Sequence, residues 1–173
     1  QAKARQTTPR AAPPPRPRPL REDLVRALAL EAYAAIRDEG RVADRALDFL
    51  LRRERRLYAP ERRAVAEAVY GMLRSEGRLA WLLRRGLGEE IVGQLGRQAR
   101  HALHYEAWRV LERGVPAARA LAEGGLSPTL LPGLVACADP APHLETLRDD
   151  PVRRLSVEAS LPAWIAALFV REA

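Results

Sequence analysis

Arginine residues concentrate on both sides of one short turn in this chain. Residues 51–63 hold six arginines and two glutamates, and a tyrosine lies in the turn. A guanidinium group offers a planar fork of N–H donors that matches phosphate, and an aromatic ring can stack on an unpaired base. The chemistry expected of this segment is therefore nucleic-acid binding. The candidate residues are Arg52, Arg53, Arg55, Arg56, Tyr58, Arg62 and Arg63, continued along the following helix by Arg74 and Arg78.

A second interpretation of these arginines is structural. Arginines near the end of a helix also bind its terminal carbonyl groups and interact favourably with its dipole. Arg74 has nearby carboxylates in Glu67 and Glu76, with which it can pair. Glu61, near the start of a predicted helix, is expected to interact with the helix dipole rather than to act as a general acid.

Residues suited to catalysis or to metal binding are few. The single cysteine, Cys137, lies between two alanines and is expected to be a buried, unreactive thiol. His101 and His104 are three residues apart on one predicted helix, but a closed zinc site takes about four ligands and the sequence offers no others nearby. We therefore predict surface or capping histidines, no metal site and no catalytic residue in this chain.

Apolar residues recur at helical spacing along most of the chain, and no segment of strand length alternates between apolar and polar residues. Prolines mark several helix starts, and glycines mark several helix ends. The expected fold class is all-α, a helical bundle. The predicted helices cover approximately residues 24–39, 43–53, 60–74, 78–85, 90–112, 115–123, 127–138 and 162–173.

The net charge of +7 is distributed unevenly along the chain. Residues 1–21 carry +6, residues 22–50 carry −3, residues 51–63 carry +4, and the remainder is neutral. The first segment is rich in proline and arginine, and we expect a disordered tail that either contacts RNA or acts as a solubilising leader. The concentrated charge of residues 51–63 attracts phosphate in a way that overall charge alone does not.

The composition also bears on location. No apolar run approaches the ~20 residues that a membrane-spanning helix needs, and the N-terminus lacks the apolar stretch of a secretory signal. One cysteine excludes an internal disulfide framework and fits a reducing compartment. These features predict a cytoplasmic protein without a membrane partner. Because the sequence begins with Gln1, we expect it to be a trimmed part of a longer chain.

Several segments occur in an order that is characteristic of one family. They are residues 26–28 (RAL), 43–47 (ADRAL), 61–74 (ERRAVAEAVYGMLR), 103–107 (LHYEA), 115–118 (VPAA) and 160–164 (SLPAW). Over most of residues 22–170 the chain resembles the NusB-like domain of bacterial ribosomal RNA cytosine-5 methyltransferases. It departs from the family in having Glu61-Arg62 where an Asp-Arg pair is usual, and in a short, less recognisable stretch between residues 116 and 151.

The resemblance implies a domain organisation. Residues 22–157 would form the NusB-like helical bundle, preceded by the tail of residues 1–21. Residues 158–173 would form a junction helix that leads to a methyltransferase domain absent from this chain. The junction residues are Ser160, Pro162 and Trp164. On this basis we expect the native chain to continue beyond Ala173.

The resemblance also implies a function. The domain would bind ribosomal RNA and position it for a methyltransferase domain of the same protein, whose cofactor is S-adenosylmethionine. This chain itself is expected to bind no cofactor. Cys137 lies in neither of the family's cysteine motifs, and no predicted strand leads into a glycine-rich loop.

Two other interpretations stay open. NusB-type bundles also pair with ribosomal or transcription proteins, so the second hypothesis is a protein-interaction module. An exposed apolar patch, together with a basic segment that does not bind RNA, would favour it. The third hypothesis is a stand-alone factor of the transcription antitermination type, although such factors normally lack the Ser-Leu-Pro-x-Trp junction.

Overall fold

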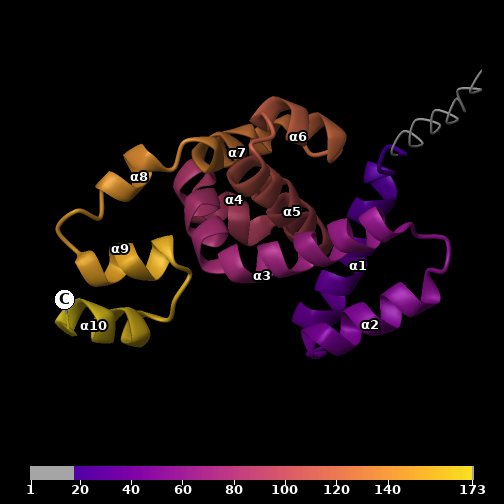
Figure 1. Ribbon diagram of the computed structural model, residues 1–173. Helices are drawn as coiled ribbons and strands as arrows, with labels where there is room; N and C mark the ends of the chain where they lie inside the picture. Colours follow the sequence, from indigo (N-terminus) through magenta and orange to yellow (C-terminus); the bar gives the residue numbers. More distant parts are fainter. Residues whose placement is uncertain (1–17, 173) are drawn as a thin grey trace, which may run out of the picture.

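The computed structural model describes residues 18–172, and every regular element in that range is helical (Figure 1). The predicted all-α fold class is therefore confirmed, whereas the NusB-like arrangement stays a prediction. Most of the predicted tail, residues 1–17, lies outside the described residues. Within residues 18–172 no helix combines the length and apolar character needed to cross a membrane.

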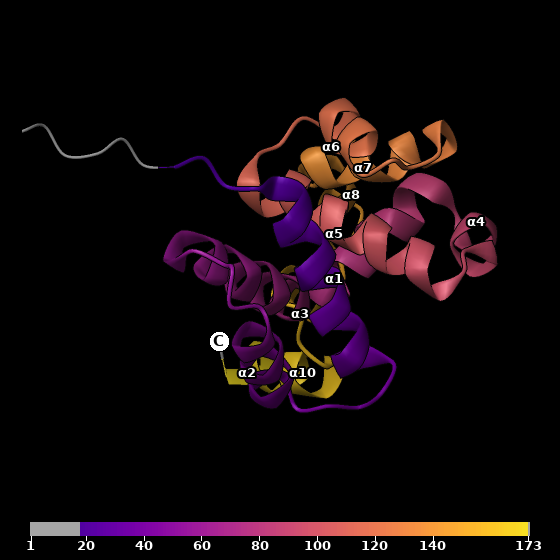
Figure 2. The ribbon, with the colours of Figure 1, turned by 90° about the vertical axis from the view of Figure 1, so that its right-hand side faces the viewer.

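Three helices form the centre of the molecule: α1 (Glu22–Arg37), α3 (Ala59–Leu87) and α5 (Arg97–Arg113). Helix α2 (Ala43–Arg53) packs on α1, while α6 (Ala117–Glu123) and α7 (Leu131–Ala138) pack on α5. A single 3-10 turn, Pro128–Leu130, precedes α7. Figure 2 shows α1 crossing in front of α3. The buried side chains between these helices are mostly leucine, alanine and valine, as the scarcity of aromatic residues requires.

The length of α3 differs from the prediction. One continuous helix of 29 residues replaces the two helices predicted for residues 60–74 and 78–85. Gly77 lies inside it, and the buried stripe continues on both sides, at Met72 and Leu79. Tertiary packing along the whole helix outweighs the low helix propensity of a single glycine.

In the next segment the structure has two helices where the sequence predicts one. The helix predicted for residues 90–112 is divided into α4 (Glu89–Gln94) and α5. Leu95 and Gly96 have extended backbone angles, and Gly96 precedes the first residue of α5. Gly93 and Gly96 both disfavour a continuous helix, and few buried contacts hold α4 in place: it has no buried residue.

Helices α3 and α7 approach closely where two glycines face each other. A Cβ atom added to Gly86 would lie 2.5 Å from the carbonyl oxygen of Pro132 and 2.7 Å from the Cα of Gly133. These are backbone atoms, so relief of the overlap requires the helices to separate. We expect Gly86→Ala to lower the free energy of unfolding by about 1–3 kcal/mol, measured by urea denaturation.

The control for this substitution is Gly93→Ala in α4. A Cβ at Gly93 meets no atom within 4 Å, and alanine is the better helix former. That variant should be as stable as the parent or slightly more stable. Equal destabilisation by the two substitutions would contradict the close approach of α3 and α7.

A buried ionic network joins α1, α5 and α6. The Glu106 carboxylate accepts hydrogen bonds from Arg26 Nε and Arg109 Nη1, each at 2.7 Å. Arg109 Nη2 donates to Glu123 at 2.5 Å, and Arg119 of α6 donates to the same carboxylate at 2.7 Å. Glu106 is 1% exposed. The network thus fixes the relative positions of three helices with fully paired charges.

The C-terminal helices form a smaller unit on α3. They are α8 (Ala141–Glu145), α9 (Pro151–Glu158) and α10 (Ala163–Glu172), which lie to one side of the central helices (Figure 1). Leu144, Leu147 and Val157 make a second small core against Trp81 of α3, and α10 packs on α9. Helices α8 and α9 were not predicted, because short helices with one buried residue each give little periodic signal.

Candidate nucleic-acid interface

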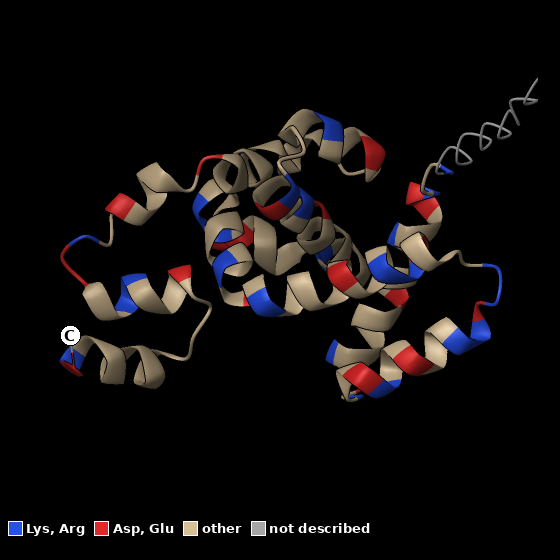
Figure 3. Cartoon of the chain, viewed as in Figure 1, with Lys and Arg blue, Asp and Glu red and all other residues tan. Residues whose placement is uncertain are grey.

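Three arginines at the turn between α2 and α3 are exposed and have no ion pair in the described part of the chain. They are Arg55, Arg56 and Arg63, and within residues 18–172 no carboxylate lies within salt-bridge distance of them. We call these three residues the basic corner. Figure 3 shows basic residues gathered at this end of α3 and in the preceding turn. Because their positive charge is uncompensated locally, they are the side chains best placed to attract phosphate.

The other arginines of the turn have partners. Arg53 donates two hydrogen bonds to Glu31 of α1, at 2.7 and 2.8 Å, and pairs with Glu54. Arg62 donates to the carbonyl oxygens of Leu51 and Glu54, at 2.6 and 3.2 Å, and thereby satisfies the end of α2. For these two residues the structure supplies the structural role that sequence reasoning left open.

Arg52 is intermediate between the arginines of the basic corner and the paired arginines, because it has one exposed ion pair. Its Nε is 2.8 Å from Asp48 one turn earlier in α2, and the arginine side chain is 80% exposed. Ion pairs this exposed contribute at most about 1 kcal/mol. The Arg52 guanidinium therefore stays available to an anion, because binding would break only the weak ion pair with Asp48.

Two further arginines, absent from the predicted set, surround the Tyr58 ring. The guanidinium carbons of Arg18 and Arg21 lie 5.2 and 5.0 Å from the ring centroid, within cation–π range. Arg18 Nη1 also donates to the Tyr58 hydroxyl at 2.9 Å. The Tyr58 side chain predicted to stack on a base is thus 42% exposed, but its ring is already in contact with two guanidinium groups from an earlier segment of the chain.

Glu61 brings Arg21 close to Tyr58, because its carboxylate binds both residues. Its carboxylate is fully buried and accepts hydrogen bonds from Arg21 Nε and Nη2, at 2.7 and 2.6 Å, and from the Tyr58 backbone N–H at 3.0 Å. The hydrogen bonds from Arg21 are the main reason that the pKa of Glu61 falls to about 2. Glu61 therefore does more than interact with the dipole of α3: it fixes the segment before α1 to the start of α3.

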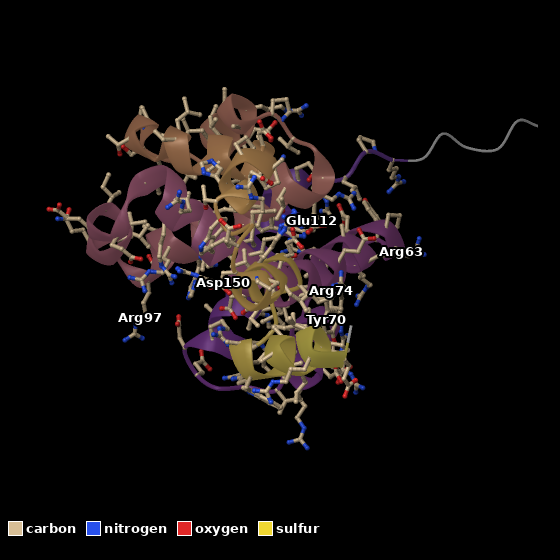
Figure 4. The ribbon with its side chains drawn as sticks, turned by 90° about the vertical axis from the view of Figure 1, so that its left-hand side faces the viewer. Arg63, Tyr70, Arg74, Arg97, Glu112 and Asp150 are labelled. Carbon is tan, nitrogen blue, oxygen red and sulfur yellow. The ribbon has the colours of Figure 1, made fainter. Side chains whose placement is uncertain are left out.

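Arg74 continues the exposed side of α3. Figure 4 shows Arg63, Tyr70 and Arg74 along one side of this helix, as their spacing on a helix requires. The Tyr70 hydroxyl donates to Asp44 of α2. Arg74 does not pair with Glu67 or Glu76, whose carboxylates bind other arginines. Arg74 is therefore a natural extension of the basic corner.

Arg78 differs from Arg74 in its surroundings. Its side chain is half-buried, and its Nε is buried without a hydrogen-bond partner among the described residues. Its backbone N–H donates to Ser160 Oγ at 3.0 Å. The sequence predicts that Arg78 extends the exposed arginine surface. Its side chain is instead partly buried, with Nε packed inside the protein.

Neither histidine of α5 belongs to a metal site in the described part of the chain. His101 Nε2 lies 3.0 Å from Asp38, and its ring makes an edge contact with Tyr33. His104 is half-buried, and its pKa is lowered to about 4, mainly by burial and further by neighbouring cations. Within residues 18–172 no group of three or more histidine, cysteine, aspartate or glutamate side chains is arranged around a common point.

Cys137 occupies the position expected of an unreactive thiol. It is 1% exposed, at the end of α7, and burial raises its pKa to about 12. The reactive thiolate form is therefore suppressed at neutral pH.

The predicted junction residues lie between α9 and α10. Ser160 packs against Gly77 of α3 and adopts a positive φ of 51°. Pro162 is exposed, and Trp164, at the start of α10, is 68% exposed. Phe169 and Leu168 are also exposed, at 59% and 49%. Trp164 is therefore not a core residue of the described chain; it belongs to an apolar face of α10 that no other helix covers.

Comparisons with protein-family models, with curated proteins and with solved structures found no match to this chain. The resemblance to the NusB-like domain consequently stays a hypothesis, and the arguments below depend on the geometry of the residues.

Proposed function

We propose that this chain is an RNA-binding helical domain that contacts the phosphate backbone through the basic corner. The observation that carries the proposal is a set of three exposed arginines, Arg55, Arg56 and Arg63, which have no ion-pair partner within residues 18–172. They lie in the same turn as the exposed Tyr58 and in the first turns of α3. Arg52 and Arg74 extend the same surface. A phosphate-binding surface of this kind holds RNA without reading its sequence, and adjacent aromatic residues favour unpaired nucleotides.

The resemblance supports a more specific form of the proposal. In that form, the domain holds ribosomal RNA for a S-adenosylmethionine-dependent cytosine-5 methyltransferase domain of the same protein. The apolar face of α10, formed by Trp164, Leu168 and Phe169, is the surface on which such a domain would pack. RNA would then lie at the start of α3, and the catalytic domain would lie on the C-terminal unit, which contacts α3 at Gly77 and Trp81.

The same apolar face supports a second candidate function, a protein-interaction module. Three large apolar side chains exposed on one ten-residue helix are typical of a protein interface. This candidate requires a partner protein at α10 and no RNA affinity at the basic corner. Measurement of RNA binding therefore separates the two functions.

The decisive experiment is RNA binding by the triple variant Arg55→Ala, Arg56→Ala, Arg63→Ala. Fluorescence anisotropy with a structured ribosomal RNA fragment should show affinity lower by about ten- to a hundred-fold, because three phosphate contacts are lost. The slope of log affinity against log salt concentration should fall in magnitude by about 2–3.

The matched control replaces three exposed arginines elsewhere with alanine. Arg85, Arg97 and Arg153 lie on α3, α5 and α9, so the change in net charge is the same as in the test variant. Equal loss of affinity in both triple variants would show that only overall charge matters. Absence of RNA binding by the parent protein would leave the protein-interaction module as the better function.

A further inference from the structure

A cleft of about 610 Å³ lies between α3, α4, α5 and the C-terminal unit, and none of the basic-corner arginines lines it. One wall is the middle of α3, and a second is the segment from Ser156 to Pro162 at the end of α9. The remaining side is formed by α4 and by the first two turns of α5. A cleft of this volume is within the range that encloses a small organic molecule, ~300–1,000 Å³.

Most of the cleft wall is apolar. Leu73 and Leu83 of α3, Val92 of α4, and Val157 and Leu161 of the C-terminal unit all line it. No side chain projects from Gly77 on the α3 wall. These groups favour the aliphatic or aromatic body of a ligand over a fully polar one.

Two arginines, Arg84 and Arg100, are also among the residues that line the cleft. Arg84 Nε is 3.6 Å from Glu89, whose side chain is 83% exposed, so this pair is long and well solvated. Arg100 uses one Nη2 donor, at 3.1 Å, on the carbonyl oxygen of Leu95. Both groups therefore retain donors and positive charge for an acid group.

The one carboxylate in the cleft wall is already occupied. Glu76 accepts a hydrogen bond from the Tyr33 hydroxyl at 3.0 Å and pairs with Arg37 at 2.9 Å. Its negative charge is thus compensated from the α1 side and does not neutralise Arg84 or Arg100. His104, whose lowered pKa of about 4 keeps it uncharged at neutral pH, adds an imidazole that can donate or accept a hydrogen bond.

We propose that this cleft binds a small organic acid. The apolar body of the ligand lies against Leu73, Val92 and Leu161, and its acid group is bound by Arg84 and Arg100. The site is independent of RNA binding at the basic corner, since the two share no residue. It also spans the central helices and the C-terminal unit, so a bound acid contacts both.

The test uses two fluorescent probes that differ in an acid group. The first is 8-anilinonaphthalene-1-sulfonate and the second is its uncharged relative N-phenyl-1-naphthylamine. The full chain should bind the sulfonate at a single saturable site, at least about ten times more tightly than the neutral probe. In the Arg84→Gln, Arg100→Gln variant the sulfonate affinity should fall about ten-fold, while the neutral probe is little affected.

Three variants complete the experiment. Arg97→Gln alters an exposed arginine of α5 that does not line the cleft, and should bind both probes as the parent does. Ala80→Phe fills the cleft from α3 and should abolish binding of both probes, with circular dichroism confirming that it folds. Trp164→Ala, Phe169→Ala removes the apolar face of α10 and should leave binding intact.

Three results would overturn the proposal. The first is the absence of saturable binding. The second is equal sulfonate affinity in the double variant Arg84→Gln, Arg100→Gln and in the single variant Arg97→Gln. The third is loss of binding in the α10 variant but not in Ala80→Phe. None of them bears on the RNA experiment, because the basic corner is unaltered throughout.

Discussion

Replacement of Glu106 with alanine is expected to lower the free energy of unfolding by about 3–5 kcal/mol, the usual cost of removing one member of a buried ion pair. The Glu106 side chain is 1% exposed, and its partners Arg26 and Arg109 are 13% and 9% exposed. Without Glu106, Arg26 retains the exposed Asp23, and Arg109 retains Glu123. Each loses its buried anion while staying largely shielded from water. Urea denaturation at pH 7, followed by circular dichroism, measures the effect.

The control for Glu106 is Glu112→Ala on the same helix. Glu112 is exposed, and its carboxylate accepts one hydrogen bond, from Ser75 Oγ at 3.1 Å. Its replacement should change stability by no more than about 0.5 kcal/mol. If the two variants were equally stable, the buried network would not hold α1, α5 and α6 as described.

The stability of the protein should fall as pH is lowered from 7 to 5, and His104 should be the main cause. The pKa of its imidazole is about 4 in the folded protein, against an ordinary value of 6.5. Between these values the unfolded chain binds a proton that the folded protein does not, so acidification favours unfolding. The expected loss is roughly 2 kcal/mol at pH 5, rising to about 3 kcal/mol at pH 4.

The surroundings of His104 account for this direction. Burial is the largest cause, followed by His101 and Arg100 of α5, Arg84 of α3 and Arg37 of α1. The nearby acids do not offset these cations, because Asp38 binds His101 and Glu76 binds Arg37.

Urea denaturation of the His104→Gln variant from pH 7 to pH 5 is the appropriate measurement. This variant should lose most of the pH dependence in that range, whereas His143→Gln, in α8, should keep it. The measurement stops at pH 5, because Glu61 and Glu123 contribute to acid unfolding only at lower pH. Their pKa values in the folded protein are about 2. A parent protein whose stability is constant from pH 7 to pH 5 would contradict the burial of His104.

The parts of the fold predicted best are those with a strong local pattern. Helix α2 has the predicted bounds, 43 to 53, because the spacing of its leucines is a local signal. The length of α3 and the existence of α9 depend on packing between segments far apart in sequence. Periodicity within a short window contains no information on that packing.

The same limit applies to the candidate interface. Arginine content drew attention to residues 51–63, but it could not rank the arginines there, because their partners lie elsewhere in the chain. Glu31 binds Arg53 across 22 positions, and Glu61 binds Arg21 across 40. Only the structure separates Arg55, Arg56 and Arg63, which have no such partners among residues 18–172, from Arg53 and Arg62, which do.

The continuity of α3 gives the molecule a fixed internal length. Its 29 residues make a rod of about 43 Å, with the basic corner at its beginning. Ser160 meets the helix at Gly77, which is 14 residues, or about 21 Å along the axis, from Arg63. Main-chain hydrogen bonds set this spacing, so it does not vary with ionic strength as surface ion pairs do. The helix therefore keeps a constant separation between a domain attached to the C-terminal unit and a ligand bound at the first turns of α3.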